Sequence, residues 1–449
     1  MSWYQKRYPG RIACVAVATI GLAFSLAGTS VAANAAPGQV FYSAPESPSS
    51  TQTDPYLPSR IEAQVESPGA FGAVFSPDGD FMYVADSFVN TVSVFRTSDL
   101  AKVASLQPSP GSSPLAQTYT VAASADGNFV YSTGPMGVIS RYSTDAWTEL
   151  DATSNTVLEI GPDKWHKVDS ADFFQIQLSL DGKTLYATNF ADNSLVTIDV
   201  DPEVEEEWHD TRVPNTSPGF SHLLALSPDG KKAYAAWKGG SGVEIHDLDT
   251  GSVTAAYGAT EASNNVTLAG DMVVSPNGDV FLISNFGLLT KVHNGSVSAK
   301  VTTKGAPAYL HRSVSVTPNG KYVVVAGGAF VEVYDTDSMF DGAVPVATFE
   351  NDASAFFLGL AIDGDGERAY ASALDGSTTV LDLRDIPESA EAPYQLPAQW
   401  IEGNGPGYTR GYAHGSSVFF TSQGGLLGAG GTVRKVAPFV PEPDANVNA

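Results

Sequence analysis

The sequence has little cysteine and little positive charge. Its one cysteine, Cys14, lies in the N-terminal apolar run. The rest of the chain therefore cannot form a disulfide or a cysteine-based metal site. Lys and Arg number 24 against 49 Asp and Glu, which gives a formal net charge of −25. Such a surface repels phosphate backbones and anionic lipids, so we expect no nucleic-acid partner.

The N-terminus has the pattern of an export signal. Lys6 and Arg11 form a basic start, residues 12–27 are almost wholly apolar, and Ala33-Asn34-Ala35 fits a cleavage motif. We therefore expect a signal peptide over residues 1–35, removed on export to the cell envelope or the exterior. A retained anchor is the alternative. No later segment is apolar enough for a membrane span, so none is expected after cleavage.

What the sequence does contain is a repeated turn. Phe75–Val84 (FSPDGDFMYV) returns in six clear variants and in a weaker eighth copy near Tyr412. The turn glycines are Gly79, Gly127, Gly182, Gly230, Gly278, Gly320, Gly366 and Gly415. Their period of about 48 residues matches one four-stranded propeller blade. The Asp-Gly and Asn-Gly pairs suit two-residue hairpins, because such turns need positive φ.

Each unit divides into four strands in the same way. In the first unit, strands are expected at Ala73–Phe75, Phe81–Ala85, Thr91–Phe95 and Val103–Leu106. Period-two alternation marks the second and third strands, and no stretch keeps a helical period. The sequence thus predicts an all-β protein, a β-propeller of four-stranded antiparallel blades.

Eight blades are expected, with seven blades and an appended hairpin as the alternative. The eighth unit lacks its own outer strand, and Arg60–Val65 can supply it and close the ring without an open sheet edge. Residues 60–440 then form a single propeller domain. Residues 36–59 form a Pro/Ser-rich spacer with a short strand near Val40, and residues 441–449 form a polar tail.

These repeats resemble a known family. S-P-D-G-x-x-x-Y-V, followed by strands such as Asn90–Val94 and Asn193–Asp199, is similar to the YVTN-type repeat of surface-layer-like and lactonase-like propellers. The resemblance covers nearly the whole chain after the leader. It implies the architecture more than the activity, because one fold hosts many functions. That family includes extracellular proteins without known catalysis, quinoprotein-like propellers and lactonase-type enzymes.

Propeller geometry nominates residues for a site. The Asp/Asn-Gly turns lie on one face, and the starts of the first strands, with the loops after the second strands, lie on the other. The candidates for ligand binding on that other face are Phe71, Tyr119, Phe174, His222, His311, Arg312, Asn189 and Asn285, with Asp86 beside them. Together they could bind an anionic or metal-linked ligand. The alternative is that each is a loop residue packing on its neighbours.

Other chemistry has less support. A metal site of His222, His311 and His414 is disfavoured, because His414 falls at the turn position of the eighth unit. The acidic stretch 203–210 and the Asp363–Glu367 segment fit a solvated loop and a structural turn better than cation sites. Neither a serine-hydrolase elbow nor a phosphate-binding loop is present.

We therefore expect a monomeric scaffold that binds a small ligand or an envelope protein, with no cofactor. A lactonase-like hydrolase and a metal-binding or redox-accessory propeller remain alternatives.

Overall fold

The chain folds into eight antiparallel four-stranded sheets, three of which gain a fifth strand. The computed structural model describes residues 40–41, 58–108, 118–148, 156–204, 207–214, 220–238, 243–256, 269–305, 312–351, 356–387, 392–402, 410–424 and 430–438. Within them the helices are η2 (Pro135–Gly137) and α2 (Asp145–Thr148), and none is long and apolar enough to cross a membrane.

Every blade has the same strand order from the centre outward. The first strands are β3 (Ala70–Phe75), β7 (Val121–Ala123), β12 (Phe173–Leu178), β16 (Phe220–Leu226), β20 (Ala269–Val274), β24 (Arg312–Val316), β28 (Phe357–Ile362) and β33 (Arg410–His414). The second strands are β4 (Phe81–Asp86), β8 (Phe129–Thr133), β13 (Thr184–Asn189), β17 (Lys232–Lys238), β21 (Val280–Ser284), β25 (Tyr322–Gly327), β29 (Arg368–Ala373) and β34 (Ser417–Ser422).

The outer half of each blade completes the sheet. The third strands are β5 (Thr91–Arg96), β9 (Val138–Ser143), β14 (Ser194–Asp199), β18 (Val243–Asp247), β22 (Leu288–His293), β26 (Phe330–Asp335), β30 (Thr378–Asp382) and β35 (Thr432–Pro438). The fourth strands are β6 (Lys102–Leu106), β11 (Lys164–Lys167), β15 (Asp210–Pro214), β19 (Val253–Ala256), β23 (Ser296–Thr302), β27 (Ala347–Glu350), β32 (Ala398–Ile401) and β2 (Ser59–Glu66).

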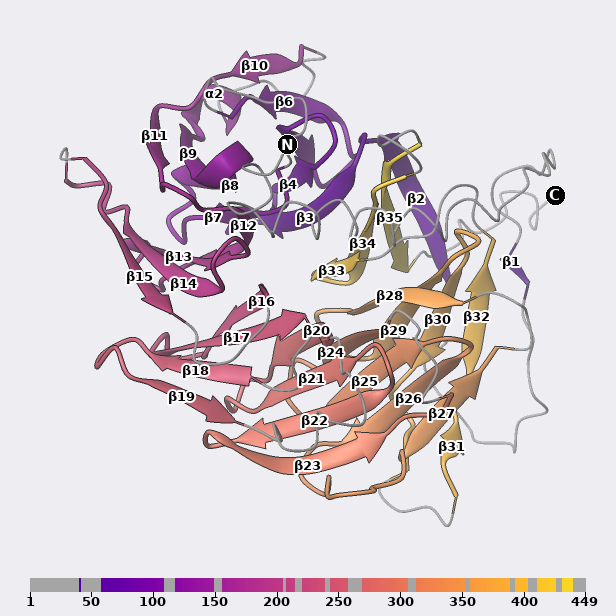
Figure 1. Ribbon diagram of the computed structural model, residues 1–449. Helices are drawn as coiled ribbons and strands as arrows, with labels where there is room; N and C mark the ends of the chain where they lie inside the picture. Colours follow the sequence, from indigo (N-terminus) through magenta and orange to yellow (C-terminus); the bar gives the residue numbers. More distant parts are fainter. Residues whose placement is uncertain are drawn as a thin grey trace, which may run out of the picture.

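The blades form a closed ring, as predicted (Figure 1). Each first strand contacts the first strand of the next blade, and β33 contacts β3. The N-terminal β2 pairs with β35 from Ser59↔Pro438 to Glu66↔Thr432 and is the outer strand of the eighth blade. Eight blades and closure by an N-terminal strand are therefore confirmed. We number the blades from 1, which begins at β3, to 8, which begins at β33.

The prediction of a two-residue turn was wrong. Phe75 pairs with Met82, so six residues separate the paired positions. Gly79 N donates to Ser76 O at 2.9 Å, and Gly79 is the loop residue with positive φ, at +77°. Pro77 fixes φ near −65° by its ring, which excludes a type I′ turn and favours a type I turn. The Asp78 carboxylate then accepts from the Ser76 hydroxyl at 2.5 Å, which explains the recurring Ser-Pro-Asp-Gly.

The core is distributed between blades rather than gathered at one centre. Within the described ranges, eight clusters of buried apolar side chains occur, and each joins two neighbouring blades. At the ring closure, Phe419 and Val433 of blade 8 pack with Ala70 and Met82 of blade 1. Apolar burial thus stabilises every interface of the ring, including the one between its two ends.

Extra segments cover several outer edges, and they follow one rule. The segment before the fourth strand of one blade lies along the fourth strand of the preceding blade. In this way β10 (Leu158–Ile160) pairs with β6, β31 (Tyr394–Gln395) with β27, and β1 (Val40–Phe41) with β32. On β23, Lys300 N donates to Asp341 Oδ1 and Gly342 N donates to Lys300 O, both from the next blade. Such cover blocks edge-to-edge aggregation.

Candidate functional site

Three aromatic side chains meet at the centre of the ring, near the start of the first strands. The rings of Tyr119 and Phe174 are stacked with centroids 5.1 Å apart, and Phe71 meets both edge-on at 6.0 and 5.8 Å. Phe71 belongs to blade 1 and Phe174 to blade 3. Because blade 2 separates these blades, the rings of Phe71 and Phe174 meet on the inner side of blade 2, where Tyr119 contacts both. The sequence predicted these three residues as site candidates, and the structure brings them together.

Arg410 of blade 8 joins this aromatic cluster. Its guanidinium lies 4.3 Å from the centroid of the Phe71 ring, a cation–π distance. Arg410 also acts electrostatically on Asp271 of blade 5, on the far side of the ring. Burial raises the pKa of Asp271, and hydrogen bonds from Val314 N and Met272 N, together with the charge of Arg410, oppose that rise.

Polar side chains of the first strands tie neighbouring blades together. Gln175 Oε1 accepts from Leu224 N at 2.9 Å, and Gln177 Oε1 accepts from Leu226 N at 3.1 Å, both across the gap between blades 3 and 4. Asp271 Oδ2 accepts from Val314 N in the same way between blades 5 and 6, at 3.1 Å. First strands of neighbouring blades do not form a ladder, so these side chains satisfy backbone N–H groups that face the centre.

Tyr412 makes the corresponding link at the ring closure. Its hydroxyl accepts from Ala73 N at 3.0 Å and donates to Phe71 O at 3.1 Å, from blade 8 to blade 1. Burial raises the pKa of Tyr412, so this hydroxyl stays neutral at physiological pH.

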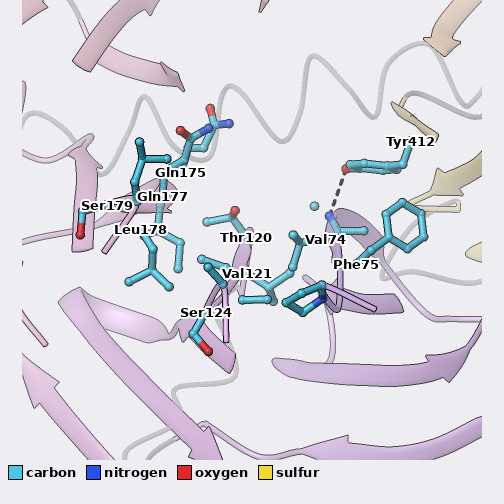
Figure 2. A pocket seen from close by; sticks show the side chains of 18 of the residues that line it. Val74, Phe75, Thr120, Val121, Ser124, Gln175, Gln177, Leu178, Ser179 and Tyr412 are labelled. Carbon is cyan, nitrogen blue, oxygen red and sulfur yellow. Dashed lines mark hydrogen bonds between the residues drawn. The ribbon is translucent and has the colours of Figure 1, made fainter. Parts of the chain in front are cut away.

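A cavity of about 410 Å³ lies between the first strands of blades 8, 1, 2 and 3 (Figure 2). Its apolar wall includes Val74, Ile176 and Leu178, and its polar wall is formed by Thr120, Gln175, Gln177, Tyr412 and Arg410. The cavity reaches Pro77, Ala125 and Leu180 in the strand-one turns, so it extends to the turn face, beyond the predicted location. Its volume lies within the range of small-molecule pockets, roughly 300–1,000 Å³.

The two predicted asparagines are both buried, but they differ in their hydrogen bonds. Asn189 is fully buried; its Oδ1 accepts from Asp172 N and Ala191 N, and its Nδ2 donates to Asp192. Asn285 lies buried against Gly270, and its Oδ1 has no hydrogen-bond partner among the described residues.

Arg312 is likewise buried. Its Nη1 donates to Lys304 O at 3.3 Å, and Glu332 stabilises its charge while burial lowers its pKa. No described contact joins Arg312 to the aromatic cluster.

Among the three predicted histidines, the structure describes only the side chain of His414. His414 lies against Phe75 and Gly79 on the turn face, as its place in the repeat predicted. His222 lies in β16, but its side chain and the whole of His311 are outside the described residues. Within the described part of the chain, no three His, Cys, Asp or Glu side chains form a metal-binding group. In the acidic stretch, Asp210 binds His166 at 2.9 Å.

Asp86 stabilises the first loop after a second strand. Its side chain is 1% exposed and accepts hydrogen bonds from the hydroxyls of Ser67, at 2.5 Å, Ser93, and Thr91, at 3.4 Å. Burial raises its pKa to about 6, although these bonds lower it. Ser67 lies between β2 and β3, so Asp86 stabilises the chain where the ring closes.

Sequence reasoning missed Arg410, Tyr412, Gln175, Gln177 and Asp271. A signal was present for Gln177, because most other blades carry an apolar residue at its position, namely Val74, Ala122, Ala225, Val273 and Ala361. Arg410 lies in the diverged eighth repeat and gave no such signal.

Comparisons with known proteins agree with this geometry at the level of fold. No protein-family model and no curated protein matches the sequence. The chain has the WD40-like β-propeller fold with eight blades. It is similar to the C-terminal WD40 domain of Sif2 (TM-score 0.58, 14% identity, 84% of this chain and 99% of that one). It is also similar to the Dos1 propeller (TM-score 0.63, 11% identity, 84% and 95%).

A third solved structure is Kuenenia stuttgartiensis hydrazine synthase (TM-score 0.50, 18% identity, 72% of this chain and 97% of that one). These identities are low, so the likeness concerns the fold alone.

Proposed function

We propose that this protein is a non-enzymatic binding scaffold that holds a small ligand, or a protruding part of an envelope protein, at the centre of its propeller. The observation that carries the proposal is the meeting of Phe71, Tyr119, Phe174 and Arg410 from four blades beside a cavity of about 410 Å³. Aromatic rings with a few convergent polar groups are the usual composition of ligand pockets.

The test is a ligand-observed NMR screen of small organic molecules and short peptides. We expect ligands that bind the wild type to lose binding when Tyr119 and Phe174 are both replaced by alanine. Phe340→Ala is the matched control, because Phe340 is 64% exposed and lies in the loop between β26 and β27, outside the cavity. Equal binding to the double variant and the wild type would contradict the proposal.

Export and family membership are part of the proposal. The leader over residues 1–35 and the YVTN-type resemblance support a protein of the cell envelope or the exterior. N-terminal sequencing of the protein recovered from its envelope fraction should begin at Ala36. A start at the initiator Met would contradict cleavage.

A further inference from the structure

The central cavity is lined by Arg410, whose guanidinium forms no direct salt bridge with a carboxylate among the described residues, although Asp271 acts on it electrostatically. Four arginines elsewhere, Arg96, Arg141, Arg212 and Arg384, each hold an aspartate at 2.6 to 2.9 Å. Arg410 has no such partner among the described residues, although acidic side chains outnumber basic ones by about two to one. A partly buried guanidinium without a direct carboxylate contact favours binding of an anion.

The position of Arg410 fits a bound ligand. The side chain lines the cavity, and its guanidinium lies 4.3 Å from the Phe71 centroid, so contact with this ring limits the positions that the guanidinium can take. A guanidinium is planar and can offer two parallel N–H donors, which match the two oxygens of a carboxylate. The restricted side chain loses little further freedom on binding.

The rest of the cavity defines the body of the ligand. Val74 and Leu178, which are only partly buried, present an apolar wall, and Thr120 and Gln177 lie beside them. Asp271 of blade 5 acts electrostatically on Arg410, and its negative charge would repel a doubly charged phosphate at Arg410 more strongly than a single carboxylate. One negative charge on an apolar body therefore suits this cavity better than a polyanion does.

We propose that the cavity binds an organic carboxylate, with Arg410 holding the carboxylate and the apolar wall holding the carbon skeleton. This inference rests on the proposed scaffold function and specifies its ligand. Two sources share this chemistry: a free small acid, and the C-terminal carboxylate of a peptide.

Benzoate is the first probe, and its uncharged analogue benzyl alcohol is the control. Isothermal titration should show saturable benzoate binding to the wild type and at least tenfold weaker binding of benzyl alcohol. Arg410→Gln should weaken benzoate at least ~10-fold, because a charge-assisted bidentate contact is lost. Arg96→Gln is the matched control and should bind benzoate as the wild type does, since Arg96 lies outside the cavity and pairs with Asp99.

Two further arms complete the test. Arg410→Lys keeps the charge but loses the planar fork, so its benzoate affinity should fall between the wild type and Arg410→Gln. It also keeps the test decisive if Arg410→Gln does not fold. A phenylalanine-ended peptide, compared with its C-terminal amide, separates the two sources. Preference for the free peptide over benzoate assigns the site to protein C-termini, and preference for benzoate assigns it to small acids.

The inference is overturned if neither benzoate nor the free-acid peptide binds, if the uncharged analogue of the ligand that binds has equal affinity, or if Arg410→Gln leaves that ligand's affinity unchanged. Should the NMR screen still find uncharged ligands that depend on Tyr119 and Phe174, the scaffold function stands and only the carboxylate assignment fails. If no ligand depends on those two side chains, both proposals fail.

Discussion

Replacing Asp86 with asparagine should make the protein less sensitive to rising pH. Asp86 is 1% exposed, and burial raises its pKa to about 6 from an ordinary value of 3.8. The folded state therefore holds the proton more tightly than the unfolded chain does. Stability from the protonated form is fully present below pH 3.8 and is lost as the pH rises to 6. Asparagine keeps the shape of the protonated side chain and cannot ionise.

The size of the effect follows from the pKa difference. About two pKa units correspond to roughly 3 kcal/mol of unfolding free energy, at about 1.4 kcal/mol per unit. Asparagine fits this position, because Asn189 and Asn285 occupy the equivalent place in blades 3 and 5. Its amide can still accept one hydroxyl bond and donate another to Ser67 or Ser93.

Urea denaturation at a series of pH values from 3.8 to 7.5 measures the effect. The unfolding free energy of Asp86→Asn minus that of the wild type should increase by about 3 kcal/mol across this range. Asp78→Asn is a control of opposite sign, because hydrogen bonds from Ser76 and Asp80 N lower the pKa of Asp78. For this pair, the unfolding free energy of the wild type minus that of Asp78→Asn should increase as the pH rises. Parallel curves for Asp86→Asn and the wild type would refute the reasoning.

Three further predictions concern stability and use the same denaturation assay. Gln177→Ala removes the hydrogen bonds to Leu226 N and Leu224 O, and should lower the unfolding free energy by about 1–3 kcal/mol. An unchanged denaturation midpoint would show that water replaces the amide. Gly182→Ala adds a methyl group in open space at φ +72°, so the unfolding free energy should fall only by the backbone strain, about 1–2 kcal/mol. A larger fall would contradict this reasoning. Val65→Asp places a charge against the core between blades 8 and 1, and should destabilise the ring by more than 2 kcal/mol; proteolysis should then begin in β2 rather than elsewhere.

The architecture was predictable because its signal is local and repeated. Ser76, Asp78 and Gly79 contact one another within four residues, so their recurrence marks each blade independently of the rest of the chain. The turn type was missed because Asp-Gly was read without Ser76, whose hydroxyl accepts a hydrogen bond from Phe81 N and so stabilises a longer loop. The eighth blade could be placed because β2 supplied a strand that its own repeat lacked.

The centre of the ring was only partly predictable, for a geometric reason. Repeat position nominated Phe71, Tyr119 and Phe174, since each lies at the start of a first strand. The position of a residue within its repeat does not predict which side chains of different blades contact one another at the centre. Contact between blades 1 and 3, and the influence of Arg410 on Asp271 between blades 8 and 5, depend on the curvature of the closed ring. That curvature follows from all eight interfaces together, and no single repeat encodes it.

The same geometry explains why the diverged blade supplies the distinctive charge. Blade 8 is held by pairing between the two ends of the chain and by the core that Phe419 and Val433 share with blade 1. Because these contacts fix the blade, its first strand is free of the full repeat motif and can place Arg410 and Tyr412 at the centre. In the regular blades 1 and 2 the equivalent strands give the cavity mainly small or apolar side chains. Regular repeats thus build the ring, and departures from the repeat, in blades 3, 5 and 8, bring polar and charged groups to its centre.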